Sequence, residues 1–133
     1  MLLYRVHLAN DISLGMYNAA VAGNFFEMDG RHPSPYSDSM LREAWYNICE
    51  RNRGTGGPPP WWFGFGSLEQ FSNWVYREEW WKRLTDEGYV ISMMNIHDDR
   101  CHLGYTQAIM HKHHSEIVTS VPVIEWETLR GAA

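Results

Sequence analysis

A chain of 133 residues, with 44% hydrophobic and 20% charged residues, has the composition of an ordinary folded domain, and we expect one domain spanning residues 1–133. Its net charge of −5 argues against a protein that binds nucleic acid through clustered lysines and arginines. Two widely separated cysteines argue against a disulfide framework, and no apolar run approaches the length of a membrane span, so we expect a cytoplasmic protein that does not insert in a membrane.

The first predicted element is a strand over residues 2–8. Apolar and less apolar positions alternate there, and Arg5 falls on the less apolar side. From residue 11 to residue 36 the periodicity fades while glycines and prolines recur, which predicts a long irregular segment that carries Tyr17, Phe25 and Phe26. Residues 37–53 then have the spacing of an amphipathic helix, which Gly54 is placed to end.

A strand followed directly by a helix is predicted after the connector GTGGPPP. Residues 61–66 form a short apolar run, and Ser67 begins a capping box with Gln70. We expect the helix to bend near Arg77 and to end at Gly88. Residues 89–96, 105–111 and 116–126 have the composition of strands. The order of elements predicts an α+β fold with a mixed or antiparallel sheet of about five strands and two helices.

Residues 58–81 contain five of the seven tryptophans. The helical positions Leu68, Phe71, Trp74 and Val75 are simplest to interpret as core. We expect the four rings before the helix to line a cleft at its start, where glycines permit a close approach of the backbone. These rings belong to Trp61, Trp62, Phe63 and Phe65.

Histidines and acidic residues cluster between residues 97 and 114, and such side chains are potential metal ligands. Their spacing matches no metal-binding motif, so a polar turn with solvent-facing strand positions is the preferred interpretation and we expect no metal. The sequence also contains no Gly-x-Ser-x-Gly elbow and no phosphate-binding loop.

Arg5, the aromatic junction and Gln107 together suit a nucleotide. Arginine offers a planar fork for phosphate, aromatic rings offer stacking faces, and glutamine can hydrogen-bond to sugar hydroxyls. Each residue also has a simpler interpretation. Arg5 can pair with a surface carboxylate, the rings can be core, and Gln107 can be an ordinary exposed strand residue.

Three segments resemble the motif regions of the ADP-ribosyltransferase-like fold: YR in the first strand, FGFGSLEQFSNWVY, and GYTQAIMHKHHSEIVTSVPV. They also resemble small proteins encoded in bacteriophage genomes. The resemblance implies that Arg5 holds NAD, that Phe63 or Phe65 lies against the nicotinamide with Ser67 nearby, and that Gln107 binds ribose.

One position departs from the pattern of active transferases, which have a glutamate where this chain has Gln107. A missing electrostatic group of this kind costs about 2.7 to 4 kcal/mol of transition-state stabilisation. Glu116 lies nine residues further on and in the following predicted strand, so we do not expect it to substitute.

These observations support three hypotheses. The first is a phage accessory or anti-defence protein that binds an NAD-derived or cyclic nucleotide through Arg5, Trp62, Phe63, Phe65, Ser67 and Gln107, with weak or no catalysis and no other cofactor. The second is an inhibitor that binds a host enzyme through exposed aromatic side chains. The third is an active ADP-ribosyltransferase.

Overall fold

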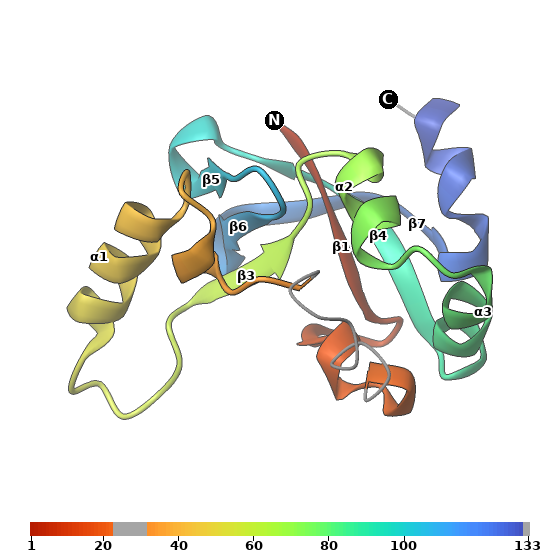
Figure 1. Ribbon diagram of the computed structural model, residues 1–133, viewed down its shortest axis with the longest axis horizontal. Coiled ribbons are helices and arrows are strands. Elements are labelled where there is room, and N and C mark those ends of the chain that lie inside the picture. The colour runs from red at the N-terminus through yellow and green to blue at the C-terminus, as the bar shows by residue number, and fades with distance from the viewer. Residues whose placement is uncertain (23–31, 132–133) are drawn as a thin grey trace.

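The computed structural model describes residues 1–22 and 32–131 and has an α+β architecture (Figure 1). Its strands are β1 (Leu2–Leu8), β2 (Asp11–Gly15), β3 (Trp61–Gly64), β4 (Tyr89–Ile96), β5 (Cys101–Leu103), β6 (Ala108–His111) and β7 (Ser115–Pro122). Its α-helices are α1 (Arg42–Asn52), α2 (Leu68–Trp74) and α3 (Glu78–Asp86), and a kinked 3-10 segment, η6 (Val123–Gly131), follows β7. Phe25 and Phe26 lie outside the described residues.

The strands form two antiparallel sheets rather than the expected single sheet of about five strands. Sheet A has the order β2-β1-β4-β7 and sheet B the order β3-β6-β5. The two strands that the sequence analysis missed are β2, placed in an irregular segment, and β5, placed in a polar turn. Both are short and largely exposed, so they carry no clear alternation of buried and exposed residues.

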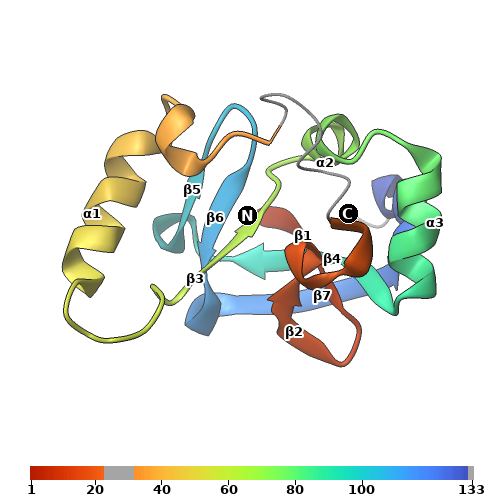
Figure 2. The same cartoon turned by 60° about the horizontal axis from the view of Figure 1, so that its bottom comes forward.

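A backbone bridge joins the two sheets, which cross at a steep angle (Figure 2). Tyr4 of β1 and Phe65, just after β3, exchange two backbone hydrogen bonds of 2.9 and 2.7 Å. Gly64 makes this junction possible, because a Cβ there would collide with the Tyr4 carbonyl oxygen and lie 2.5 Å from the Met110 methyl group.

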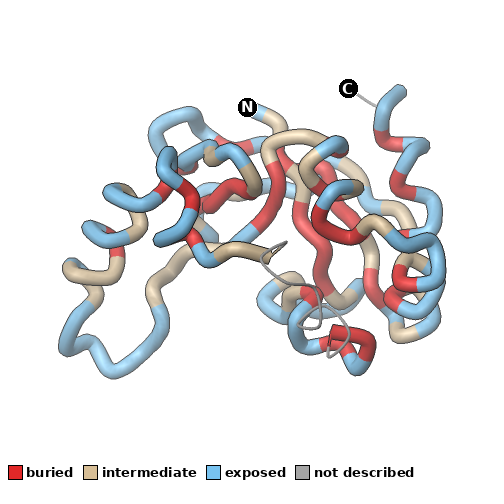
Figure 3. Tube along the Cα trace, in the orientation of Figure 1, coloured by how far each residue is buried: buried red, intermediate tan, exposed pale blue. Residues whose placement is uncertain are grey.

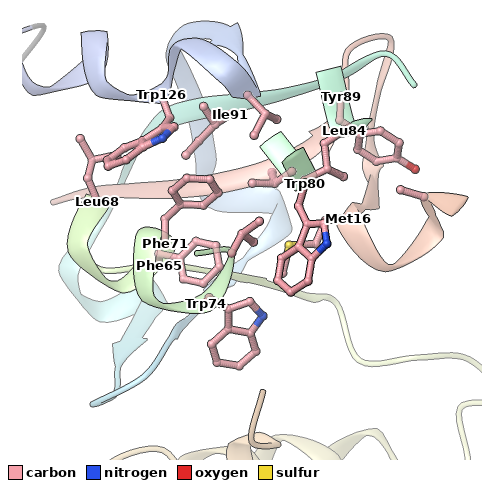
Figure 4. Close-up of a cluster of buried hydrophobic side chains, with 14 of the residues drawn as sticks. Met16, Phe65, Leu68, Phe71, Trp74, Trp80, Leu84, Tyr89, Ile91 and Trp126 are labelled. Atoms are coloured by element: carbon pink, nitrogen blue, oxygen red, sulfur yellow. The ribbon is translucent and has the colours of Figure 1, made fainter. Parts of the chain in front are cut away.

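The main core lies between sheet A and the segments α2, α3 and η6 (Figure 4). Rings of Phe65, Phe71, Trp74, Trp80 and Trp126 fill it together with Leu84 and Ile91. A second cluster between the sheets contains Leu3, Met94, Cys101 and Met110. On the outer face of sheet B, α1 packs through Leu41 and Ile48 against Ile109.

The capping prediction at Ser67 is confirmed in detail. The Ser67 hydroxyl accepts a hydrogen bond of 3.2 Å from the Gln70 backbone N–H, while the Gln70 side-chain oxygen accepts one of 2.7 Å from Gly66 N–H. The predicted long helix breaks between α2 and α3, where Val75 leaves the helical conformation, close to the bend expected at Arg77. Gly88 has a φ of 91° and follows the end of α3, as predicted.

The helix expected over residues 37–53 begins later, at Arg42, because residues 35–37 form a separate 3-10 turn. Among the described residues, no helix has the length and apolar character needed to cross a membrane. Both cysteines, Cys49 and Cys101, are free thiols.

Candidate functional site

Arg5 is buried on β1, with 5% of its surface exposed. Its Nε donates to the Ile12 carbonyl at 3.1 Å and its Nη2 to the Ser13 carbonyl at 3.4 Å, both on β2. Its Nη1 donates to the Phe63 carbonyl on β3 at 2.8 Å. The guanidinium also lies 5.0 Å from the ring centroid of Trp62, within cation–π range.

These contacts make Arg5 a link between strands of the two sheets. Within the described residues no carboxylate forms an ion pair with it, and burial lowers the pKa of Arg5 to about 10, so it stays charged at neutral pH. The guanidinium N–H groups that the sequence analysis assigned to phosphate already donate to carbonyl oxygens of the chain.

Arg5→Lys is therefore expected to lower the free energy of unfolding by about 2 kcal/mol. A single ammonium group cannot reach three carbonyls on two strands, and an unsatisfied buried polar group costs about 1–3 kcal/mol. Urea denaturation measures the change, and Arg51→Lys on the exposed surface of α1 is the matched control. Equal stability of the two variants would contradict this role for Arg5.

The rings of Phe63 and Phe65 have different environments. Phe65 is 3% exposed and packs in the main core, 5.8 Å from the Phe71 ring and 5.8 Å from the Trp74 ring. Phe63 is 40% exposed and lies 5.1 Å from the half-buried ring of Trp45 on α1. Of these two residues, only Phe63 offers a solvent-accessible ring.

Ser67 and Gln107 lie away from the Arg5 contacts. The Ser67 hydroxyl caps α2, and Gln107 is 4% exposed and donates to the Pro33 carbonyl at 2.9 Å. The structure thus brings Arg5 to the Trp62 ring and the Phe63 carbonyl, whereas the Phe63 ring lies beside Trp45 of α1 and Gln107 is engaged with the segment before α1.

Two open hollows lie outside this cluster. One, of about 740 Å³, is lined by residues around the end of β4 and the start of β7, including His97, Asp98, His114 and Glu116. The other, of about 280 Å³, is lined by Tyr4, Ser67, Glu69 and Arg130, among others. Ser67 is the one predicted site residue that lines either hollow.

The histidine-rich segment forms a loose cluster of rings on sheet B. The His111 ring centroid lies 5.4 Å from that of His113 and 5.0 Å from that of His114. Burial, followed by the neighbouring cationic groups, lowers the pKa of His111. Within residues 1–22 and 32–131, no three histidine, cysteine or acidic side chains converge in a way that would hold a metal ion.

A buried carboxylate, Asp38, organises a surface that sequence reasoning missed. It is 3% exposed and accepts hydrogen bonds from the backbone N–H groups of Met40, Tyr105 and Thr106, at 3.1, 3.2 and 2.9 Å, and from the Thr106 hydroxyl at 2.8 Å. Burial acts to raise the pKa of Asp38, but these hydrogen bonds outweigh it and hold the pKa below its usual value.

Around this carboxylate, four large side chains are exposed. We call them the aromatic patch: Tyr36 (45% exposed), Met40 (53%), Tyr46 (55%) and Tyr105 (71%). Asp38 joins the backbones of Met40 and Tyr105, while the nearby Cys49 of α1, with burial and smaller contributions from Glu50 and Tyr46, raises the pKa of Tyr36. The available sequence signal was Asp38 just before a predicted helix, where aspartate often binds nearby backbone N–H groups.

The comparisons with known proteins decide the family. No curated protein and no solved structure matches the chain. A family model described as Bacteriophage T4 Y00F protein matches residues 1–124. The chain belongs to this Y00F family of phage proteins. The matched range includes Arg5, Asp38 and the whole aromatic patch.

Proposed function

We propose that this member of the Y00F family is an accessory protein that binds a protein of the infected cell through the aromatic patch. The observation that carries the proposal is the exposure of four large side chains around one fully hydrogen-bonded buried carboxylate. Tyrosine is enriched among the residues that dominate binding energy at protein interfaces. The patch therefore has the chemistry of a recognition surface.

The shape of the patch favours a protein over a small molecule. Small ligands bind in concave sites that bury most of their surface, and neither described hollow is lined by a residue of the patch. In α1, Ile48 is the buried residue, while Trp45 and Cys49 remain half-buried. Figure 3 shows most of this helix as exposed or half-buried. A partner that covers the patch would also bury part of the surface of α1 that is now exposed.

The local structure suits an interface that is ordered before binding. Asp38 fixes the turn that carries Tyr105, and Gln70 holds the same turn by donating to the Gly104 and Tyr105 carbonyls at 2.9 and 3.2 Å. A surface that is already ordered loses less conformational entropy on binding. The net charge of −5 would assist encounter with a basic partner.

The patch is tested by comparing wild-type protein with a Tyr46→Ala, Tyr105→Ala double variant in capture from lysates of host cells. A host protein should be captured at near-stoichiometric level by the wild type, and the double variant should lose at least tenfold in affinity, since hot-spot truncations cost about 2 kcal/mol or more. Titration of the purified partner gives the affinity ratio.

Ile124→Ala is the matched control, because Ile124 is 37% exposed on η6, an element outside the patch. It should capture the partner as well as the wild type does. Equal capture by the double variant and by Ile124→Ala would contradict the assignment of the patch, as would the absence of any specific partner.

The second candidate is the nucleotide-binding function implied by the ADP-ribosyltransferase-like resemblance. It is favoured by one observation, the position of the Arg5 guanidinium, which lies 5.0 Å from the ring centroid of Trp62 and donates to the Phe63 carbonyl. Thermal shift with NAD, ADP-ribose and cyclic dinucleotides tests it, because ligand at 100 times its dissociation constant should add about 2.7 kcal/mol of stability. If none of these nucleotides stabilises the protein, the nucleotide-binding function is contradicted and binding to a host protein remains the proposal.

A further inference from the structure

Three polar side chains form a continuous hydrogen-bonded chain across sheet A. His7 on β1 lies with its Nε2 atom 2.6 Å from the Ser92 hydroxyl on β4, and the Ser92 hydroxyl lies 2.6 Å from that of Ser120 on β7. His7 is 2% and Ser92 0% exposed, whereas Ser120 is exposed. The chain thus runs from a buried imidazole to a hydroxyl in solvent.

The hydrogen bond at His7 Nδ1, on the other side of the imidazole ring from Ser92, sets the direction of the hydrogen bonds in this chain. His7 Nδ1 lies 2.8 Å from the Leu8 carbonyl oxygen, which can only accept, so Nδ1 carries the proton in the neutral ring. Nε2 is then an acceptor, and the Ser92 hydroxyl donates to it. The Ser92 oxygen is left to accept from Ser120, so the exposed hydroxyl is linked through Ser92 to a base.

The surroundings of Ser120 suit an apolar substrate. The register pairs Ser120 with Ser92, Ile117 with Met94, and Pro122 with Val90, so Ile117 and Pro122 stand on the same face of the sheet as the hydroxyl. Ile117 is 44% exposed. Because β7 is at the edge of sheet A, some of its N–H groups also point away from β4 and are open to an incoming oxygen atom.

We propose that Ser120 is a nucleophile for acyl transfer from esters of apolar acids, activated through Ser92 by His7 as the base. The Ser120 oxygen forms a bond to the ester carbonyl carbon and gives its proton to Ser92, whose own proton passes to His7 Nε2. The carbon–oxygen bond of the ester then breaks, and the alcohol leaves with the electron pair and takes a proton from the Ser92 hydroxyl, which regains one from His7 Nε2. Water hydrolyses the acyl-serine by the same relay.

The charges that face His7 set the pH range of this activity. Burial is the largest influence and lowers the pKa of His7, and Arg5 lowers it further, while the hydrogen bond to Leu8 and the charge of Asp11 act in the opposite direction. His7 is therefore neutral and able to accept a proton at pH 7. The reaction should be independent of pH near neutrality and should slow on acidification, once His7 is protonated.

A fluorophosphonate probe tests the proposal on the whole protein, because attack by a serine oxygen on phosphorus expels fluoride and leaves a stable adduct. Peptide mapping by mass spectrometry should find the adduct on Ser120. Its rate of formation should be at least tenfold higher than on Ser72, a half-buried serine that donates to the Glu69 carbonyl and has no histidine partner. Ser120→Ala should abolish this adduct.

The relay is tested by His7→Gln and Ser92→Ala, each of which should slow labelling of Ser120 at least tenfold, in keeping with the contribution of about 10²–10⁴ made by a general base. Should either variant fail to fold by circular dichroism, the pH profile of wild-type labelling replaces it, with the rate falling in acid once His7 is protonated. Labelling of Ser120 no faster than that of Ser72, or a rate that does not fall with acid, would overturn the proposal.

Discussion

Replacing Gly64 with alanine is expected to destabilise the protein by about 3 kcal/mol or more, or to prevent folding. The added Cβ would collide with the Tyr4 carbonyl oxygen and would lie 2.5 Å from the Met110 methyl group. Overpacking a core costs about 1–3 kcal/mol when side chains can yield, and here the nearest atom belongs to the backbone of a central strand. Urea denaturation gives the free energy of unfolding of both proteins.

Gly57→Ala is the matched control for that experiment. A Cβ added at Gly57 would meet no heavy atom within 4 Å, and the residue does not need a positive φ, so its replacement should change stability by less than about 1 kcal/mol. If Gly64→Ala were as stable as Gly57→Ala, the sheets could not be joined at Tyr4 and Phe65 as described.

Asp38→Ala is expected to cost about 3 kcal/mol or more. The substitution leaves three backbone N–H groups without their acceptor, and hydrogen bonds to a charged group each contribute about 1.5–3 kcal/mol. It should also release the turn that carries Tyr105 and so weaken binding through the aromatic patch. Asp99→Ala on the exposed surface is the control and should be close to neutral.

The contribution of Asp38 should depend on pH. Because the folded-state pKa lies below the unfolded value of about 3.9, the unfolded chain binds more protons in acid. The stabilisation is therefore complete above about pH 4 and is lost as pH falls through the folded pKa. Below that range, wild type and Asp38→Ala should converge in stability. A constant difference between them down to pH 2 would show that ionisation of Asp38 does not matter.

Local signals predicted local structure well. The reciprocal hydrogen bonds of Ser67 and Gln70 were readable because both partners lie within one turn of a helix. The residue range of β4 was predicted as it is found, since its eight residues form an unbroken, mainly apolar run bounded by Gly88 and a polar turn. The α+β class followed from the order of such elements.

Features that depend on distant residues were not predictable. The division into two sheets depends on Gly64 meeting Tyr4, 60 positions earlier in the chain by their residue numbers, and no periodicity reports such a contact. The partners of Arg5 were equally hidden, because the sequence shows the guanidinium but not the carbonyl groups of β2 and β3 that surround it. Its interpretation as a phosphate ligand remained open for that reason.

The aromatic patch shows the same limit for function. Tyr36, Tyr46 and Tyr105 did not stand out beside the tryptophans of residues 58–81, and the hydrogen bonds of Asp38 that bring Tyr105 to Met40 join residues far apart in the chain. The tryptophans proved to be divided, with Trp74 and Trp80 in the main core and Trp61 and Trp62 half-buried on β3 of sheet B, in separate clusters. Side-chain type alone did not separate core from surface.

Photo-crosslinking at position 105 tests the central claim most directly. A photoreactive phenylalanine analogue replaces Tyr105 in one protein and Ile124 in another, and both are irradiated inside host cells. We predict a single prominent adduct with a host protein from position 105 and none from position 124. No adduct from position 105, or the same adduct from both, would contradict a recognition surface formed by Tyr36, Met40, Tyr46 and Tyr105.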